Sequence, residues 1–220
     1  MTKFKADLFD LDGTLLDTLE DLADSTNAAL SEMGFATHPV AAYRYFVGDG
    51  ARVLAERALP EDKRDDATIE ACRDKMRAEY SKRWDKKTKA YPGIKQMLRE
   101  LSRRGIKMAV LSNKPHDFTE LTVKKFLGDF HFDCVLGVQA DVPKKPDVAG
   151  ALRIACALGV RPEEIVYVGD TNTDMQTANA AGMYAVGAMW GFRTPAELTQ
   201  SGAKTLIEKP LDVLGFFGKN

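Results

Sequence analysis

The 220-residue sequence is long enough for one large domain or for a domain that carries an insertion. Its formal net charge of -1 gives no basic excess, so we do not expect nucleic acid as a partner. No apolar leader and no run approaching the roughly 18 apolar residues of a membrane span is present, so we expect a cytoplasmic protein without a membrane partner. The cysteines at positions 72, 134 and 156 are expected to be buried, reduced thiols.

A first strand is predicted at residues 4–9, and an acidic turn follows it, Asp10-Leu11-Asp12-Gly13-Thr14. In an extended chain, Asp10 and Asp12 would point the same way, with about 7 Å between them. Gly13 allows a sharp turn, and Thr14 can hydrogen-bond the turning backbone. Taken alone, the segment fits an ordinary strand end as well as a cation site, so its meaning depends on the rest of the chain.

An all-helical block is predicted over residues 15–89. Apolar residues recur at helical spacing over 19–33, 41–59 and 65–84, and no strand pattern is present. The segment from Thr18 to Asp21 resembles a capping box at the start of the first helix. Gly48-Asp49-Gly50 interrupts the second helical region.

From Tyr91-Pro92-Gly93 onward, strands and helices alternate. Strands are predicted at 107–112, 132–137, 165–170 and 184–189, with helices at about 94–105, 116–127, 147–158 and 173–181. This alternation predicts an α/β fold, a Rossmann-like parallel sheet with helices on both faces. The first strand joins the same sheet if the helical block is an insertion. We therefore expect a core domain of residues 1–14 and 90–220 and a helical cap domain of residues 15–89.

Polar groups follow four of the predicted strands, and parallel strands end at one edge of a sheet. Besides the first acidic turn, these groups are Ser112-Asn113, Lys144-Lys145 in a loop between two prolines, Asp170 and Asp174. Clustered carboxylates suit Mg²⁺, and a lysine with the metal can neutralise a transferred phosphoryl group. One acid would attack phosphorus, while a neighbouring acid would protonate the leaving oxygen and then activate water.

The motifs DLDGT, LSNK, KKP and VGDTNTD, in this order, resemble the four signature motifs of the haloacid dehalogenase-like superfamily. The helical block lies where that family has a helical cap. The resemblance implies that Asp10 is the nucleophile that forms an aspartyl-phosphate and that Asp12 is the general acid and base. Ser112 and Asn113 would hold phosphate oxygens, and Lys145, which precedes proline, would brace the phosphoryl group.

The same resemblance implies a Mg²⁺ cofactor. Asp10, the carbonyl oxygen of Asp12 and Asp170 would bind the ion, and Asp174 would order its water shell.

Within the superfamily, residues 46–59 and 189–210 resemble phosphoglycolate phosphatases. This likeness implies a Mg²⁺-dependent phosphatase with a small phosphorylated metabolite, 2-phosphoglycolate, as its substrate. Gly48 and Gly50 would let the cap backbone approach the substrate. Two interpretations of Arg52 stay open, a partner of a substrate carboxylate and an exposed arginine at a helix start. Open alternatives are an inorganic pyrophosphatase, a sugar-phosphate phosphatase, a β-phosphoglucomutase-like enzyme and, in another class, a regulatory protein phosphorylated on aspartate. Both a monomer and a homodimer remain open.

Overall fold

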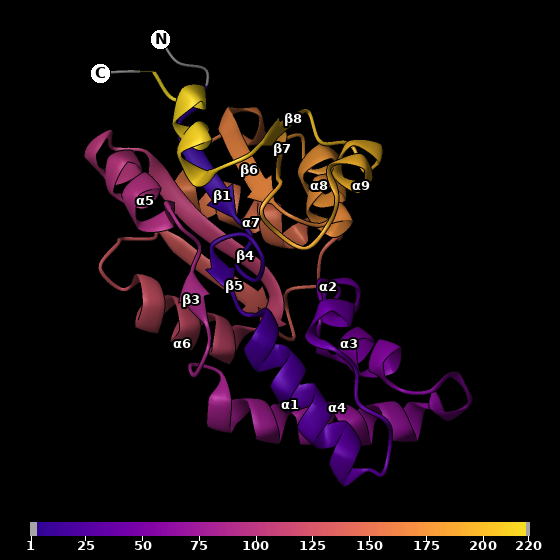
Figure 1. Ribbon diagram of the computed structural model, residues 1–220. Coiled ribbons are helices and arrows are strands. Elements are labelled where there is room, and N and C mark those ends of the chain that lie inside the picture. The colour runs from indigo at the N-terminus through magenta and orange to yellow at the C-terminus, as the bar shows by residue number, and fades with distance from the viewer. Residues whose placement is uncertain (1–3, 219–220) are drawn as a thin grey trace. The chain divides into compact units, whose positions relative to one another are not determined.

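The computed structural model describes residues 4–218, and the chain divides into two compact units (Figure 1). Of the described residues, 4–16 and 90–218 belong to the α/β unit, and residues 17–89 to the helical unit. The chain thus leaves the α/β unit after its first strand and returns more than seventy residues later to complete it.

A six-stranded sheet forms the centre of the α/β unit, in the order β5-β4-β1-β6-β7-β8. Its strands are β1 (Ala6–Phe9), β4 (Lys107–Pro115), β5 (Cys134–Val138), β6 (Ile165–Gly169), β7 (Tyr184–Ala188) and β8 (Thr205–Ile207). Every neighbouring pair is parallel, which confirms the predicted sheet. Strand β8 was not predicted, because three residues are too few to show a period.

Helices cover both faces of this sheet, as the sequence predicts. Helices α5 (Ile94–Arg103) and α6 (His116–Leu127) pack on the face that includes Phe9. Helices α7 (Ala149–Leu158), α8 (Asn172–Ala180) and α9 (Pro195–Gln200) pack on the face that includes Leu8. Because strand side chains alternate in direction, the apolar β1 supplies both hydrophobic cores.

One acid lies inside the first of these cores. Asp7 is fully buried in β1, and its register neighbours are Met108 and Val166. Neither carboxylate oxygen has a hydrogen-bond partner among the described residues. Burial therefore raises the pKa of Asp7 well above its ordinary value.

The helical unit consists of four α-helices and short 3₁₀ turns. The helices are α1 (Leu19–Glu32), α2 (Tyr43–Phe46), α3 (Ala51–Ala58) and α4 (Asp66–Arg83), and the 3₁₀ turns are Val40–Ala42 and Glu61–Lys63. Helices α1 and α4 pack against each other along their length. Buried residues of α4 recur at helical spacing, at Ile69, Cys72, Met76 and Tyr80, as predicted.

The predicted capping box at Thr18 is wrong. The Thr18 side chain makes no capping hydrogen bond. The Asp21 carboxylate instead accepts hydrogen bonds from the backbone N–H groups of Lys87 (3.0 Å) and Thr88 (2.8 Å) and from the Thr88 hydroxyl (2.7 Å). A buried acid thus fastens the start of the helical unit to its end.

Short strands at the limits of the helical block were also missed. Strands β2 (Leu16–Asp17) and β3 (Lys89–Ala90) pair as a two-stranded sheet. Their pairing joins segments that are far apart in the sequence, so no local sequence pattern could predict it.

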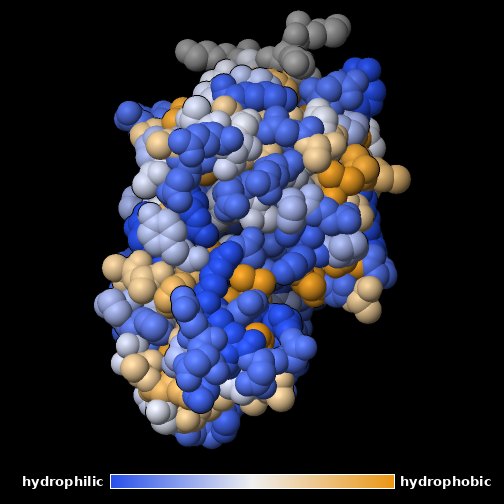
Figure 2. Space-filling model, turned by 90° about the vertical axis from the view of Figure 1, so that its right-hand side faces the viewer, coloured by the Kyte–Doolittle hydropathy of each residue, from blue (hydrophilic) through white to orange (hydrophobic). Residues whose placement is uncertain are grey.

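Hydrophilic residues predominate on the face drawn in Figure 2, and hydrophobic ones form small patches. Among residues 4–218, no helix has the length and apolar character needed to cross a membrane.

The expectation for the cysteines holds for Cys72, which is buried, but Cys134 is half-buried and Cys156 is exposed. Cys156 lies next to the buried stripe of α7 and faces solvent.

Candidate active site

The predicted site residues follow strands in the middle of the sheet. The chain adds β4 and β5 on one side of β1 and then β6 to β8 on the other. Ligands bind outside the carboxyl ends of parallel strands where the strand order reverses. Asp10 directly follows β1, Asp170 directly follows β6, and Ser112 lies near the carboxyl end of β4. The three are therefore brought to one edge.

Three carboxylates form a buried cluster there. Oxygens of Asp10, Asp170 and Asp174 all lie within 4.8 Å of one another, and all three residues are buried. Burial raises the pKa of Asp10 well above its ordinary value, an effect that Lys145 opposes. Burial and the nearby Asp174 raise the pKa of Asp170 to about 7. The cluster thus resists carrying three negative charges without a cation.

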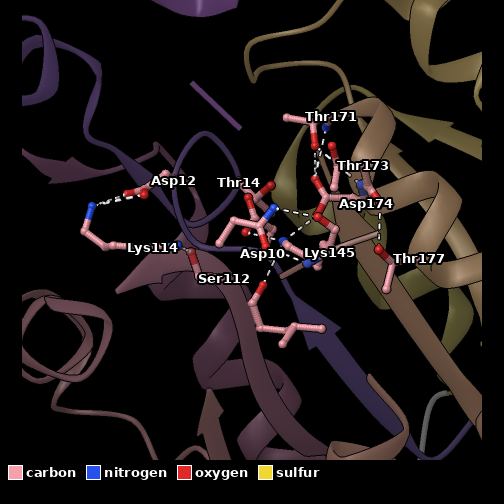
Figure 3. Close-up of polar contacts among 12 residues, drawn as sticks. Asp10, Asp12, Thr14, Ser112, Lys114, Lys145, Thr171, Thr173, Asp174 and Thr177 are labelled. Atoms are coloured by element: carbon pink, nitrogen blue, oxygen red, sulfur yellow. Dashed lines mark hydrogen bonds and ion pairs between the residues drawn. The ribbon is translucent and has the colours of Figure 1, made fainter. Parts of the chain in front are cut away.

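Lys145 places a positive charge inside this cluster (Figure 3). Its Nζ atom donates to Asp10 Oδ1 at 2.7 Å, to Asp174 Oδ1 at 2.7 Å and to the Leu111 carbonyl at 2.9 Å. Burial disfavours its charge, but Asp10 and Asp174 hold the pKa of Lys145 well above its ordinary value. The neighbouring Lys144 is exposed.

Asn113 holds the backbone of Lys145 from both sides. The Asn113 amide nitrogen donates to the Lys145 carbonyl at 3.1 Å, and its oxygen accepts the Lys145 N–H at 2.7 Å. Because both ends of this side-chain amide are engaged, the buried Asn113 fixes the loop that carries the lysine.

Two groups distant in sequence hold the Asp170 carboxylate. The Thr14 hydroxyl donates to Oδ1, and the Phe192 N–H donates to Oδ2, each at 2.8 Å. Thr14 was expected to bond the turning backbone, and that expectation is wrong. Gly13 has φ +91°, and a Cβ atom built there would lie 2.3 Å from Asp170 Oδ2. A glycine is thus required for the close approach of the first turn to Asp170.

Asp174 is held by its own helix and by a buried tyrosine. Its Oδ2 accepts from the Thr171 N–H at 3.1 Å and the Thr171 hydroxyl at 2.7 Å, as part of the capping box of α8. The Tyr167 hydroxyl donates to Asp174 Oδ1 at 3.2 Å. The sequence analysis missed Tyr167, although a tyrosine hydroxyl within an otherwise apolar strand indicates a buried hydrogen-bond partner.

Asp12 lies apart from the cluster. Strand β1 ends at Phe9, and the chain then turns, so the alternation of an extended strand, on which the expectation for Asp10 and Asp12 was based, does not apply to them. Asp12 instead pairs with Lys114, whose Nζ atom lies 3.0 Å from both carboxylate oxygens (Figure 3). Ser112 Oγ accepts the Lys114 N–H at 3.2 Å. Lys114 is part of the LSNK motif, but the sequence analysis gave it no role of its own.

The remaining predicted residues, Gly48, Gly50 and Arg52, belong to the helical unit. Gly48 and Gly50 have φ of +125° and +90° and precede α3. The half-exposed Arg52 pairs with Glu70 at 3.1 Å and also contacts Asp66. Carboxylates of its own unit thus already neutralise this arginine.

The donor set fits a divalent cation. Three carboxylates meet the ammonium group of Lys145, and the positive charge of the buried Arg193 also acts on Asp170, so negative charge is still in excess in a buried place. Hard carboxylate oxygens are the ligands that Mg²⁺ and similar ions prefer. Asp10, Asp170 and Asp174 could therefore hold a metal ion, whereas the Asp12 carboxylate is not one of the cluster.

Comparison with known proteins identifies the family. Residues 8–188 match the model of the haloacid dehalogenase-like hydrolases. A phosphoglycolate phosphatase from Psychrobacter arcticus is 35% identical over 88% of this chain and 86% of its own length. One from Mannheimia succiniciproducens is 31% identical over 97% of this chain and 98% of its own.

A solved structure agrees over the whole chain. A Lactobacillus delbrueckii subsp. bulgaricus protein proposed to be a phosphoglycolate phosphatase superposes with a TM-score of 0.92, at 28% identity and with all of both chains covered. The chain therefore belongs to the haloacid dehalogenase-like hydrolase family. It is an enzyme of the phosphoglycolate phosphatase-like type within that family, so the predicted family and class of enzyme are confirmed.

Proposed function

We propose that this enzyme hydrolyses a small phosphomonoester, 2-phosphoglycolate, with Mg²⁺ as cofactor and through an aspartyl-phosphate. The observation that carries the proposal is the placement of Asp10 directly after β1, with Lys145 on one carboxylate oxygen and two further acids beside it. Its curated relatives of similar length bear the name phosphoglycolate phosphatase, which supports this choice of substrate.

In the proposed first step, an Asp10 oxygen attacks phosphorus and the bond to the ester oxygen breaks. Asp12, in its protonated form, gives its proton to the departing oxygen, so an alcohol leaves and Asp12 becomes a carboxylate. In the second step, Asp12 takes a proton from water, whose oxygen attacks the aspartyl-phosphate and releases inorganic phosphate. Lys145 orients Asp10 and balances charge on the phosphoryl oxygens, and the Ser112 hydroxyl binds one of those oxygens.

For the metal we propose Asp10, Asp170 and the Asp12 carbonyl oxygen as ligands. Asp174 would contribute a further negative charge beside the ion. When bound, Mg²⁺ would neutralise the carboxylates and withdraw negative charge from the transferred group. The raised pKa values of Asp10 and Asp170 support this choice. Burial makes the charged form of both carboxyl groups unfavourable, and a bound cation would stabilise that charged form.

We also propose that the helical unit acts as a cap over substrate bound to the α/β unit. Its insertion between β1 and α5 supports this role. Gly48 and Gly50 remain our proposed cap contacts to the substrate. The ion pairs of Arg52 with Glu70 and Asp66 favour a structural role for that arginine over a contact with substrate.

The test is phosphate release from 2-phosphoglycolate, pyrophosphate, hexose phosphates and nucleotides, with and without Mg²⁺. We expect 2-phosphoglycolate to have the highest kcat/KM, and chelation of the metal to abolish turnover. Asp10→Asn should lose turnover of every ester. If Asp10→Asn turned esters over at the wild-type rate, the mechanism would be wrong. A flat, weak profile across all esters would contradict the substrate assignment.

Transfer of the phosphoryl group to a sugar, without release of free phosphate, would favour a mutase. A long-lived phosphoprotein without turnover would instead favour the regulatory alternative.

A further inference from the structure

The two acids that follow β1 are bound to different lysines. Asp10 contacts Lys145, and Asp12 contacts Lys114 through both carboxylate oxygens at 3.0 Å. The Lys114 side chain is 4% exposed and that of Asp12 is 13% exposed, so this ion pair is largely shielded from water. Figure 3 shows the Asp12 and Lys114 side chains on the opposite side of Asp10 from Lys145. The pair thus holds the Asp12 carboxylate away from the three-carboxylate cluster.

The backbone of Lys114 is fixed in this position. Its N–H donates to Ser112 Oγ at 3.2 Å, and its carbonyl accepts from the Thr119 hydroxyl at 3.2 Å. Strands β4 and β5 also change register between Leu111 and Pro115, which sets the direction of the segment that carries Lys114. The backbone of Lys114 is therefore held, and its side chain is more buried than that of Asp12. In the exchange described below, Asp12 is the partner that turns.

A turn of Asp12 toward the leaving group would have an electrostatic consequence. It would take a carboxylate away from a lysine that is more than nine-tenths buried, which is unfavourable unless another anion takes its place. A substrate with a carboxylate on its leaving group carries such an anion close to the ester oxygen. Substrates with neutral leaving groups have none.

We propose that Lys114 is a specificity-determining residue that binds a carboxylate on the leaving group of the substrate. The substrate carboxylate replaces that of Asp12 on the Lys114 ammonium, and Asp12 is thereby freed to reach the leaving oxygen. The exchange makes and breaks no covalent bond and leaves the charge on the lysine balanced. This inference rests on the proposed phosphatase function and adds the residue that recognises the carboxylate of the substrate.

The kinetic test compares 2-phosphoglycolate with ethyl phosphate, which carries a methyl group in place of the carboxylate. In Lys114→Gln, we expect the ratio of the two kcat/KM values to fall by roughly 30-fold or more, the range for loss of one partner of a buried charge pair. Activity on ethyl phosphate should rise, because Asp12 is no longer held. Lys114→Arg should restore part of the ratio. Lys144→Gln is the matched control, since it removes an exposed neighbouring charge.

A merely structural role for Lys114 would lower both activities together and leave their ratio unchanged, which would overturn the inference. A second measurement needs neither turnover nor a variant. The wild-type enzyme should bind 3-phosphonopropionate about tenfold or more tightly than propylphosphonate in titration calorimetry, since only the former carries a carboxylate.

Equal affinities for the two phosphonates would overturn the inference. If no ester releases phosphate, the proposed function fails, and the pair of phosphonates still decides whether the enzyme has a carboxylate subsite. Failure of the two proposals is thus distinguishable.

Discussion

Lys145 Nζ lies 2.7 Å from Asp10 Oδ1, at the centre of a buried cluster with three carboxylates. Because Asp174 shares the same ammonium group, the lysine joins the residues that follow β1 with those that follow β6. This contact joins two of the four sequence motifs directly.

The first prediction concerns this lysine. Lys145→Met should reduce phosphate release by about 10²-fold to 10³-fold, because a preorganised charge beside the reacting carboxylate is lost. Steady-state kinetics on 2-phosphoglycolate would measure the change. Lys144→Met serves as the control and should stay close to wild type. A Lys145→Met enzyme within threefold of wild type would contradict the role given to this residue.

A second prediction concerns Gly13. In Gly13→Ala, the new methyl group would meet the Asp170 carboxylate, and the backbone would be held at φ +91°. We expect kcat/KM to fall by about tenfold or more and stability to fall by about 1–3 kcal/mol. Kinetics and urea unfolding would measure the two effects.

Gly105→Ala separates the two causes in that experiment. Gly105 has φ +67° but open space around it, so this variant should lose stability and keep activity. Equal losses of activity in both variants would show that contact with Asp170 is not the reason for the glycine.

A third prediction concerns the buried Asp7. Its folded-state pKa is raised above the unfolded value of about 3.9, so the folded chain holds the extra proton and stability falls as pH rises through the interval between the two values. Asp7→Val should therefore be more stable than wild type by about 1–3 kcal/mol at neutral pH. The gain should grow from pH 4 upward until the folded-state pKa is passed.

Urea unfolding at several pH values would test this prediction. Asp7→Asn is the matched control, because it keeps a polar group and removes the titration. The pH dependence should flatten in both variants, whereas the gain in stability should be larger in Asp7→Val. If the stability of the wild-type protein rose relative to that of both variants as the pH increased through this interval, the account would be wrong.

A fourth prediction concerns the helical unit. Asp21→Ala should leave the buried Thr88 hydroxyl and two N–H groups without their acceptor, which costs about 1–3 kcal/mol. Hydrogen exchange at the amides of Lys87 and Thr88 should accelerate accordingly. Asp24→Ala removes only a half-exposed ion pair with Lys87 and should change local stability by about 0.5 kcal/mol or less. Similar exchange rates in the two variants would argue against the role of Asp21.

Local sequence patterns were sufficient for most of the architecture. The apolar strands and amphipathic helices after residue 90 have clear periods, because side chains on a strand or helix repeat their environment at short spacing. Their alternation predicts the parallel sheet, and the acids after two of the strands predict that Asp10 and Asp170 meet at its edge. Strands β2, β3 and β8 were not predicted, because strands of two or three residues are too short to show a period.

The internal arrangement of the site needed the tertiary structure. From the sequence alone, residue types and strand ends identified Asp10, Lys145, Asp170 and Asp174 as a set, since the carboxyl ends of parallel strands necessarily share an edge. The sequence did not reveal that Asn113 holds the Lys145 backbone or that Lys114 holds Asp12 away from Asp10. Those pairings depend on where a chain turns and which side chains face each other across neighbouring strands, and only the packed fold decides that.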